Sequence, residues 1–180
     1  MDVRLAQDEM RAGFVLGAPG VLVSGLAWLA AGVVWAQAGV GPAFTVLFIG
    51  GIAIFPVSAL MSRLVFRAPA VPKANPFNAL GFETTVPLFG GLLAAFVLLK
   101  PMAPVGLALF AAIVGARYFA FATIYRERTY WALGATLFAA GYVYIRQPNA
   151  LSSNVALCVG VIELAFAILL FVRWRSSSPA

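Results

Sequence analysis

The sequence contains no histidine and only one cysteine, Cys158. Histidine is the commonest metal ligand and the commonest general base, so its absence argues against zinc, haem and Ser-His chemistry. A single cysteine cannot form an intrachain disulfide, and Cys158 lies in an apolar run, where we expect it to pack as a small core residue. We therefore expect no metal and no cofactor, and the sequence identifies no catalytic residue.

Charged residues are also scarce, at 10% of the chain, whereas 63% of the residues are hydrophobic. Soluble domains have about 25% charged and about 45–50% apolar residues, so this composition indicates one membrane domain over residues 1–180. The net charge of +6 would suggest nucleic acid in a soluble protein. Here the basic residues flank apolar runs, which is typical of membrane orientation signals. We expect the lipid bilayer as partner, and no nucleic acid.

Six apolar runs predict an all-α bundle of six transmembrane helices, because most of them reach the roughly 17–25 residues that a spanning helix needs. Their approximate limits are Phe14–Trp35, Ala43–Phe66, Ala79–Leu99, Ala103–Tyr125, Tyr130–Ile145 and Val155–Val172. Before them, apolar residues at helical spacing predict a short interfacial helix over residues 2–12. No small-residue cleavage site follows, so we expect the first span to act as its own insertion signal.

The distribution of lysine and arginine predicts that both termini are cytoplasmic. Nine basic residues fall at the N-terminus, the C-terminus and the loops after the second and fourth runs, while Lys100 and Arg146 alone fall on the other side. Basic residues concentrate on the cytoplasmic side of membrane proteins. The segment Arg67–Asn78, with its three prolines, predicts an extended loop on that side.

Three ionisable residues lie inside the apolar runs: Glu83, Arg117 and Glu163. Arg117 precedes Arg126 by nine positions and Glu163 precedes Arg173 by ten, which places both charges about 13–15 Å from the cytoplasmic helix ends. This match in depth predicts that Arg117 pairs with Glu163, with Glu83 as a third member. The pair is either a packing contact or a polar site for a solute or ion.

Tyr118, Phe121 and Tyr125 recur at helical spacing beside Arg117. They are expected to pack in the core or to line a cavity in which the Tyr118 hydroxyl donates near the ion pair. The candidate substrate-binding residues are therefore Arg117, Glu163, Glu83 and Tyr118.

Four blocks of the chain carry a family resemblance. They are GVLVSGLAWLAAG at 20–32, LFIGGIAIFPVSAL at 47–60, NPFNALGFETT at 75–85 and GARYFAFATIYRERTYWALG at 115–134. The chain resembles an uncharacterised family of small bacterial membrane proteins, known as a domain of unknown function. The resemblance implies six helices and the bacterial cytoplasmic membrane, but no activity.

Three classes of function fit these patterns. The first is a transporter or channel for a small solute or ion, with the polar site at Arg117 and Glu163. The second is a structural or accessory membrane protein, either a monomer or a homo-oligomer. The third is an intramembrane enzyme that acts on a lipid-soluble substrate, with Glu83 or Glu163 as acid or base. The first is our leading hypothesis, and the chain is not expected to be an enzyme.

Overall fold

The computed structural model describes residues 2–147 and 154–177, and over these residues the protein is all-α. The elements, in chain order, are α1 (Val3–Gly13), a short 3-10 turn η1 (Val15–Gly17), α2 (Ala18–Ala38), α3 (Val40–Leu64), α4 (Phe77–Glu83), α5 (Val86–Ile124), α6 (Thr129–Arg146) and α7 (Val155–Ser177). Helix α1 lies where an N-terminal helix over residues 2–12 is predicted, and its interfacial position stays a prediction. The predicted loop Arg67–Asn78 falls largely in the connection between α3 and α4, which contains no helix.

Helix α5 reverses its direction at Met102, whose φ of −153° and ψ of 54° are not helical. Pro101 and Pro104 stand on either side, and proline cannot donate the hydrogen bond that continues a helix. The two arms run antiparallel and in contact, since a Cβ placed on Gly106 would lie 2.9 Å from the carbonyl oxygen of Ala95. The reversal lies where the sequence predicts the connection between the third and fourth apolar runs.

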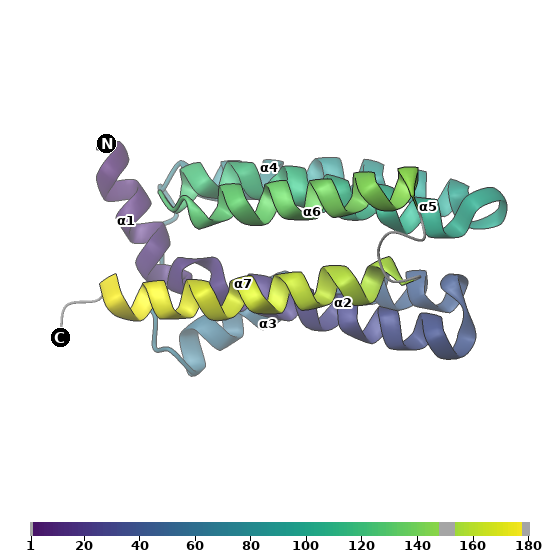
Figure 1. Ribbon diagram of the computed structural model, residues 1–180. Helices are drawn as coiled ribbons and strands as arrows, with labels where there is room; N and C mark the ends of the chain where they lie inside the picture. Colours follow the sequence, from purple (N-terminus) through teal and green to yellow (C-terminus); the bar gives the residue numbers. More distant parts are fainter. Residues whose placement is uncertain (1, 148–153, 178–180) are drawn as a thin grey trace.

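The helices form two layers (Figure 1). One layer contains α4, the two arms of α5, and α6, with α6 packed closely on α5. The other contains α2, α3 and α7, in which α2 packs against both of its neighbours. Helix α1 crosses one end of the two layers, and both described chain ends lie at this same end.

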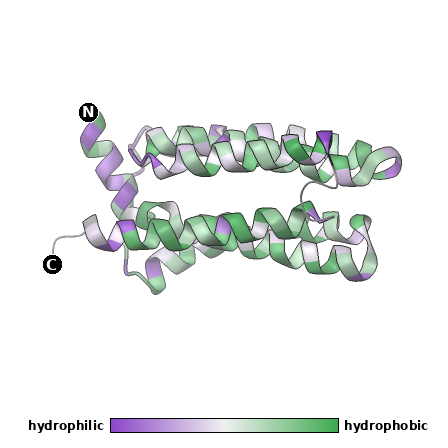
Figure 2. Cartoon of the chain, viewed as in Figure 1, coloured by the Kyte–Doolittle hydropathy of each residue, from purple (hydrophilic) through white to green (hydrophobic). Residues whose placement is uncertain are grey.

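Among residues 2–147 and 154–177, four helical stretches are long and apolar enough to cross a membrane: Val15–Ala38, Val40–Leu64, Phe77–Ile124 and Val155–Ser176. The third is 48 residues long and includes α4 and both arms of α5. Hydrophobic residues cover the lengths of the helices, whereas hydrophilic residues gather on α1 and near the ends (Figure 2). By helix length and hydropathy, the chain is a multi-pass membrane protein.

The predicted apolar run Ala79–Leu99 contains a break in the helix, because α4 ends at Glu83 and α5 begins at Val86. The hydroxyl groups of Thr84 and Thr85 both donate to the carbonyl oxygen of Gly81, at 2.8 and 3.3 Å. Such side-chain bonds to the backbone compete with helical ones. Pro87 reinforces the break, because it has no N–H to bond the carbonyl four residues earlier.

Candidate functional site

Glu163 on α7 is fully buried, with 0% of its surface exposed. Its Oε1 accepts a hydrogen bond of 2.7 Å from the hydroxyl of Tyr118 on α5. Its Oε2 has no hydrogen-bond partner among the described residues, and it is the one buried side-chain polar atom of that part of the chain in this condition. A buried oxygen without a partner is costly in a protein and more so in a membrane, so Glu163 requires an explanation.

The surroundings of Glu163 come from three helices in both layers. Tyr118 approaches from α5, and Ser24 on α2 lies close to both Tyr118 and Glu163. The backbone of α2 packs directly on the glutamate, because a Cβ placed on Gly25 would lie 3.1 Å from the Cβ of Glu163. The Tyr118–Glu163 hydrogen bond therefore joins the two helix layers at a tightly packed point.

Arg117 does not form the predicted pair with Glu163. Its Nε and Nη2 donate to the hydroxyls of Thr84 and Thr85, at 3.3 and 3.4 Å. Its guanidinium also lies over the ring of Phe121, 4.8 Å from the centroid. Successive residues of an α-helix point about 100° apart, so Tyr118 faces α7 while Arg117 faces the break between α4 and α5. The equal depth of the two charges did not bring them together.

Glu83 is also separate from this site. It is the last residue of α4 and is exposed on the outside of the bundle. Within residues 2–147 and 154–177, the ion pairs are Arg126–Asp8 at 2.9 Å and Arg173–Glu127 at 3.3 Å. The prediction of a three-membered cluster of Arg117, Glu163 and Glu83 is therefore wrong. The predicted hydroxyl donor Tyr118 does form a hydrogen bond to the carboxylate of Glu163.

A stack of tyrosine rings extends from Tyr118 toward the α1 end of the bundle. Tyr130 stacks between Tyr118 and Tyr125, with ring centroids 5.9 and 5.5 Å apart, respectively. Phe121 meets all three rings edge-on. Tyr130 lies on α6 and is fully buried, and it was not among the predicted site residues. Tyr118, Phe121 and Tyr125 recur at helical spacing along the chain, but Tyr130 lies on α6. The stack therefore depends on the packing of α5 against α6.

The hydroxyl of Tyr130 donates to the carbonyl oxygen of Leu16, at 2.8 Å. Leu16 belongs to η1, where Val15, Leu16 and Gly17 have φ values of 53°, 55° and 75°. Residues other than glycine rarely adopt this left-handed region, so the turn must be held by its surroundings. Gly17 has no side chain to separate the turn from the tyrosines, since a Cβ there would overlap the Tyr130 hydroxyl.

Helix α1 is fixed to the same end of the tyrosine stack by polar contacts. Gln7 donates to the carbonyl oxygen of Thr123 at 2.6 Å, and Arg11 donates to that of Tyr125 at 2.7 Å. On another side, the Asn75 amide donates to Ala6 and Glu9. Helix α1 thus connects the end of α5 to the loop after α3, which the sequence did not predict.

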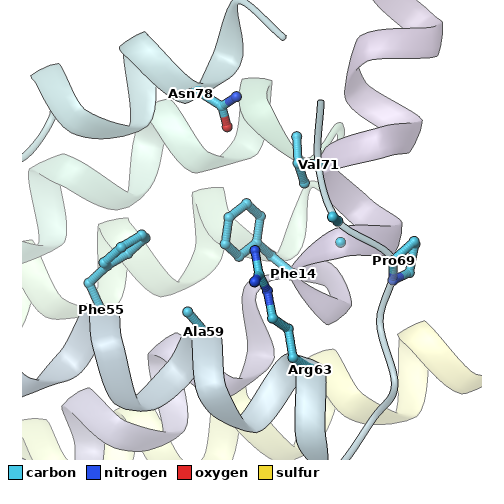
Figure 3. A pocket seen from close by; sticks show the side chains of 9 residues that line it. Phe14, Phe55, Ala59, Arg63, Pro69, Val71 and Asn78 are labelled. Atoms are coloured by element: carbon cyan, nitrogen blue, oxygen red, sulfur yellow. The ribbon is translucent and has the colours of Figure 1, made fainter. Parts of the chain in front are cut away.

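A cavity of about 160 Å³ lies at this end of the molecule, between α3, the Gly13–Phe14 corner, the loop after α3, and α4 (Figure 3). None of the four residues predicted to bind substrate lines it. Among the described residues, no three metal-binding side chains of His, Cys, Asp or Glu gather together. The candidate site around Glu163 is therefore a packed polar contact, and the cavity is a separate feature.

A model of a family of unknown function, DUF7010, matches residues 3–173. The matched region includes α1, both helix layers, and the contact between Tyr118 and Glu163. Searches of the curated proteins and of the solved structures gave no match.

Proposed function

Because this chain belongs to DUF7010, a family of unknown function, its activity must be inferred from its own geometry, and we propose that it is a proton-coupled transporter of a small solute. We further propose that it lies in a bacterial cytoplasmic membrane, on the basis of the resemblance of its sequence blocks to small bacterial membrane proteins. The observation that carries the transport proposal is the buried carboxyl group of Glu163, which has one oxygen without a partner.

The proposed topology has six spans: α2, α3, the first and second arms of α5, α6, and α7. The reversal at Met102 supports two crossings within α5. The two chain ends, the loop after α3 and the α5–α6 connection lie at the α1 end of the bundle. Nine of the basic residues lie in these segments or in the helix turns beside them, which supports a cytoplasmic location for that end.

A merely structural contact with Tyr118 would use one oxygen of Glu163 and would not need an ionisable group. Acidic side chains are expensive inside a membrane and are typically associated with proton or ion pathways. A proton can bind the open Oε2 without any further ligand. A metal ion would need several oxygen ligands, and the described residues offer no cluster of acidic side chains. The geometry therefore favours a proton over a metal ion.

Two interruptions of the helices support a transport role. Transporters commonly build their binding sites at broken helices within the membrane. The η1 turn is linked through Tyr130 to the tyrosine stack that reaches Tyr118. At the second break, between α4 and α5, the guanidinium of Arg117 donates hydrogen bonds to the hydroxyls of Thr84 and Thr85. We assign the proton to Glu163 and Tyr118, and an anionic group of the solute to Arg117. Glu83 is left out because it is exposed on the outer surface.

The test is a pH jump on full-length protein reconstituted on a solid-supported membrane, which records charge displacement without knowledge of the solute. We expect a transient current in the wild-type protein and at least a ten-fold smaller current in Glu163→Gln. The matched control is Glu83→Gln, which should keep the current within two-fold. Equal currents from the wild-type protein and Glu163→Gln would refute the proton site, provided that both proteins elute as single folded species in size-exclusion chromatography.

A second candidate function is structural, with Tyr118 and Glu163 acting as a clasp between the layers. The close packing of α2 on Glu163 supports it, because Gly25 leaves no space for a solute at that point. A glutamine can accept the Tyr118 hydrogen bond as well as a glutamate does. The clasp alone therefore predicts that Glu163→Gln leaves both stability and pH-jump current unchanged.

A further inference from the structure

The cavity near α1 contains a basic residue without an acidic partner. Arg63, from the last turn of α3, lines the cavity and is exposed. No hydrogen bond or ion pair of Arg63 occurs within the described ranges 2–147 and 154–177. Figure 3 shows its side chain extending toward Phe14, with Val71 and Asn78 farther along the same space. An unpaired guanidinium beside a cavity is suited to an anion.

A second polar group of the cavity is the amide of Asn78, on α4. Its Nδ2 already donates to the carbonyl oxygen of Pro72, at 2.9 Å. An amide nitrogen carries two hydrogens, so one donor is left for another group. The guanidinium and this amide come from two different helices, α3 and α4, and border one space.

The remaining walls of the cavity are apolar. They include Phe14, Val71 and Phe55, and Phe55 is 69% exposed on the outer face of α3. Farther along that face, Ile52 and Phe48 are also exposed. These residues belong to a helix that is apolar and long enough to span the membrane. The cavity thus combines an anion-binding group with a surface suited to acyl chains.

We propose that this cavity binds the headgroup of an anionic phospholipid. The phosphate would accept hydrogen bonds from Arg63 and Asn78, and the acyl chains would lie along the exposed face of α3. Basic pockets between transmembrane helices on the cytoplasmic side are suited to anionic headgroups. A cavity of about 160 Å³ holds part of a headgroup and not a whole lipid, which agrees with chains lying outside it. This site does not depend on the role of Glu163.

The experiment is native mass spectrometry of the full-length protein, released from micelles that contain equal amounts of phosphatidylglycerol and phosphatidylcholine. We expect the wild-type protein to retain at least five times as much phosphatidylglycerol as phosphatidylcholine. Arg63→Gln should lose most of this preference. The matched control is Lys73→Gln, which removes an exposed charge from the nearby loop but not from the cavity, and it should retain the preference.

A second variant tests the cavity itself. Ala59→Leu adds bulk to the α3 wall while leaving Arg63 in place, and we expect it to reduce phosphatidylglycerol retention as well. Equal losses in Arg63→Gln and Lys73→Gln would overturn the site, because they would indicate general charge attraction. Full retention in both Arg63→Gln and Ala59→Leu would overturn it too. Displacement of the lipid by millimolar glycerol 3-phosphate would assign the cavity to a soluble phosphate compound and overturn the lipid proposal.

Discussion

Glu163 and Arg117 are the two charged side chains that the sequence places deepest in the apolar runs, and the structure treats them differently. Glu163 is fully buried between three helices and has one strong hydrogen bond and one open oxygen. Arg117 is half-buried and makes two long hydrogen bonds to threonine hydroxyls, together with a ring contact. The difference teaches that depth along a helix does not determine a partner; the direction around the helix axis does.

The largest expected effect is at Glu163. Glu163→Ala removes a fully buried side chain and leaves the Tyr118 hydroxyl without its acceptor. We expect the free energy of unfolding to fall by about 3 kcal/mol, from the lost packing and the orphaned donor together. Denaturant titration of the purified protein in mixed micelles, followed by tryptophan fluorescence, measures this change. Glu163→Gln is the control and should lose less than about 1 kcal/mol, since an amide oxygen can still accept.

An intermediate effect is expected at Tyr118. Tyr118→Phe keeps the ring in the tyrosine stack but removes the one hydrogen bond to Glu163. Leaving the carboxyl group without that donor should reduce the free energy of unfolding by about 2 kcal/mol in the same titration. In the double variant with Glu163→Ala, the fall in the free energy of unfolding should be clearly smaller than the sum of the two single falls, because both substitutions remove the same interaction. Simple additivity would show that the hydrogen bond contributes nothing to stability.

The smallest expected effect is at Arg117. Arg117→Met removes a charge that is costly in the membrane, and its threonine partners keep their own bonds to Gly81. We expect the free energy of unfolding to change by less than about 1 kcal/mol. Arg117→Met combined with Glu163→Ala should be additive within about 0.5 kcal/mol, because the two side chains do not pair. A strong coupling between them would restore the predicted ion pair and contradict the observed geometry.

The sequence predicted the helices well, because long apolar runs and flanking charges are local signals. Predicted and observed limits agree closely for α6 and at the start of α7. The exact position of the break at Thr84–Thr85 did not follow from the apolar run, which continues through it, because the break depends on the hydroxyl bonds to Gly81. The reversal in α5 was anticipated at Lys100–Pro104, where a charge and two prolines interrupt the run.

The sequence identified residues of the candidate site more successfully than it identified the contacts between them. Tyr118 and Glu163 were both identified, and they meet. Arg117 was paired with the wrong group, because counting residues from a helix end gives depth but not direction. Tyr130 was not among the predicted site residues; it is buried in the protein, where its hydroxyl donates to the η1 turn. That contact joins residues 114 positions apart, so no local pattern could have identified it.

The placement of α7 beside α2 has a consequence for how the protein is made. One layer contains the first and the last of the long apolar helices, so it cannot be completed until synthesis reaches the C-terminal segment. The hairpin of α5 and the adjoining α6 are synthesised earlier and already present the Tyr118 hydroxyl. A ribosome that stops before α7 would leave the glycine-lined face of α2 uncovered in the bilayer. The hydrogen bond from Tyr118 to Glu163 between the two layers therefore forms only after α7 has been synthesised.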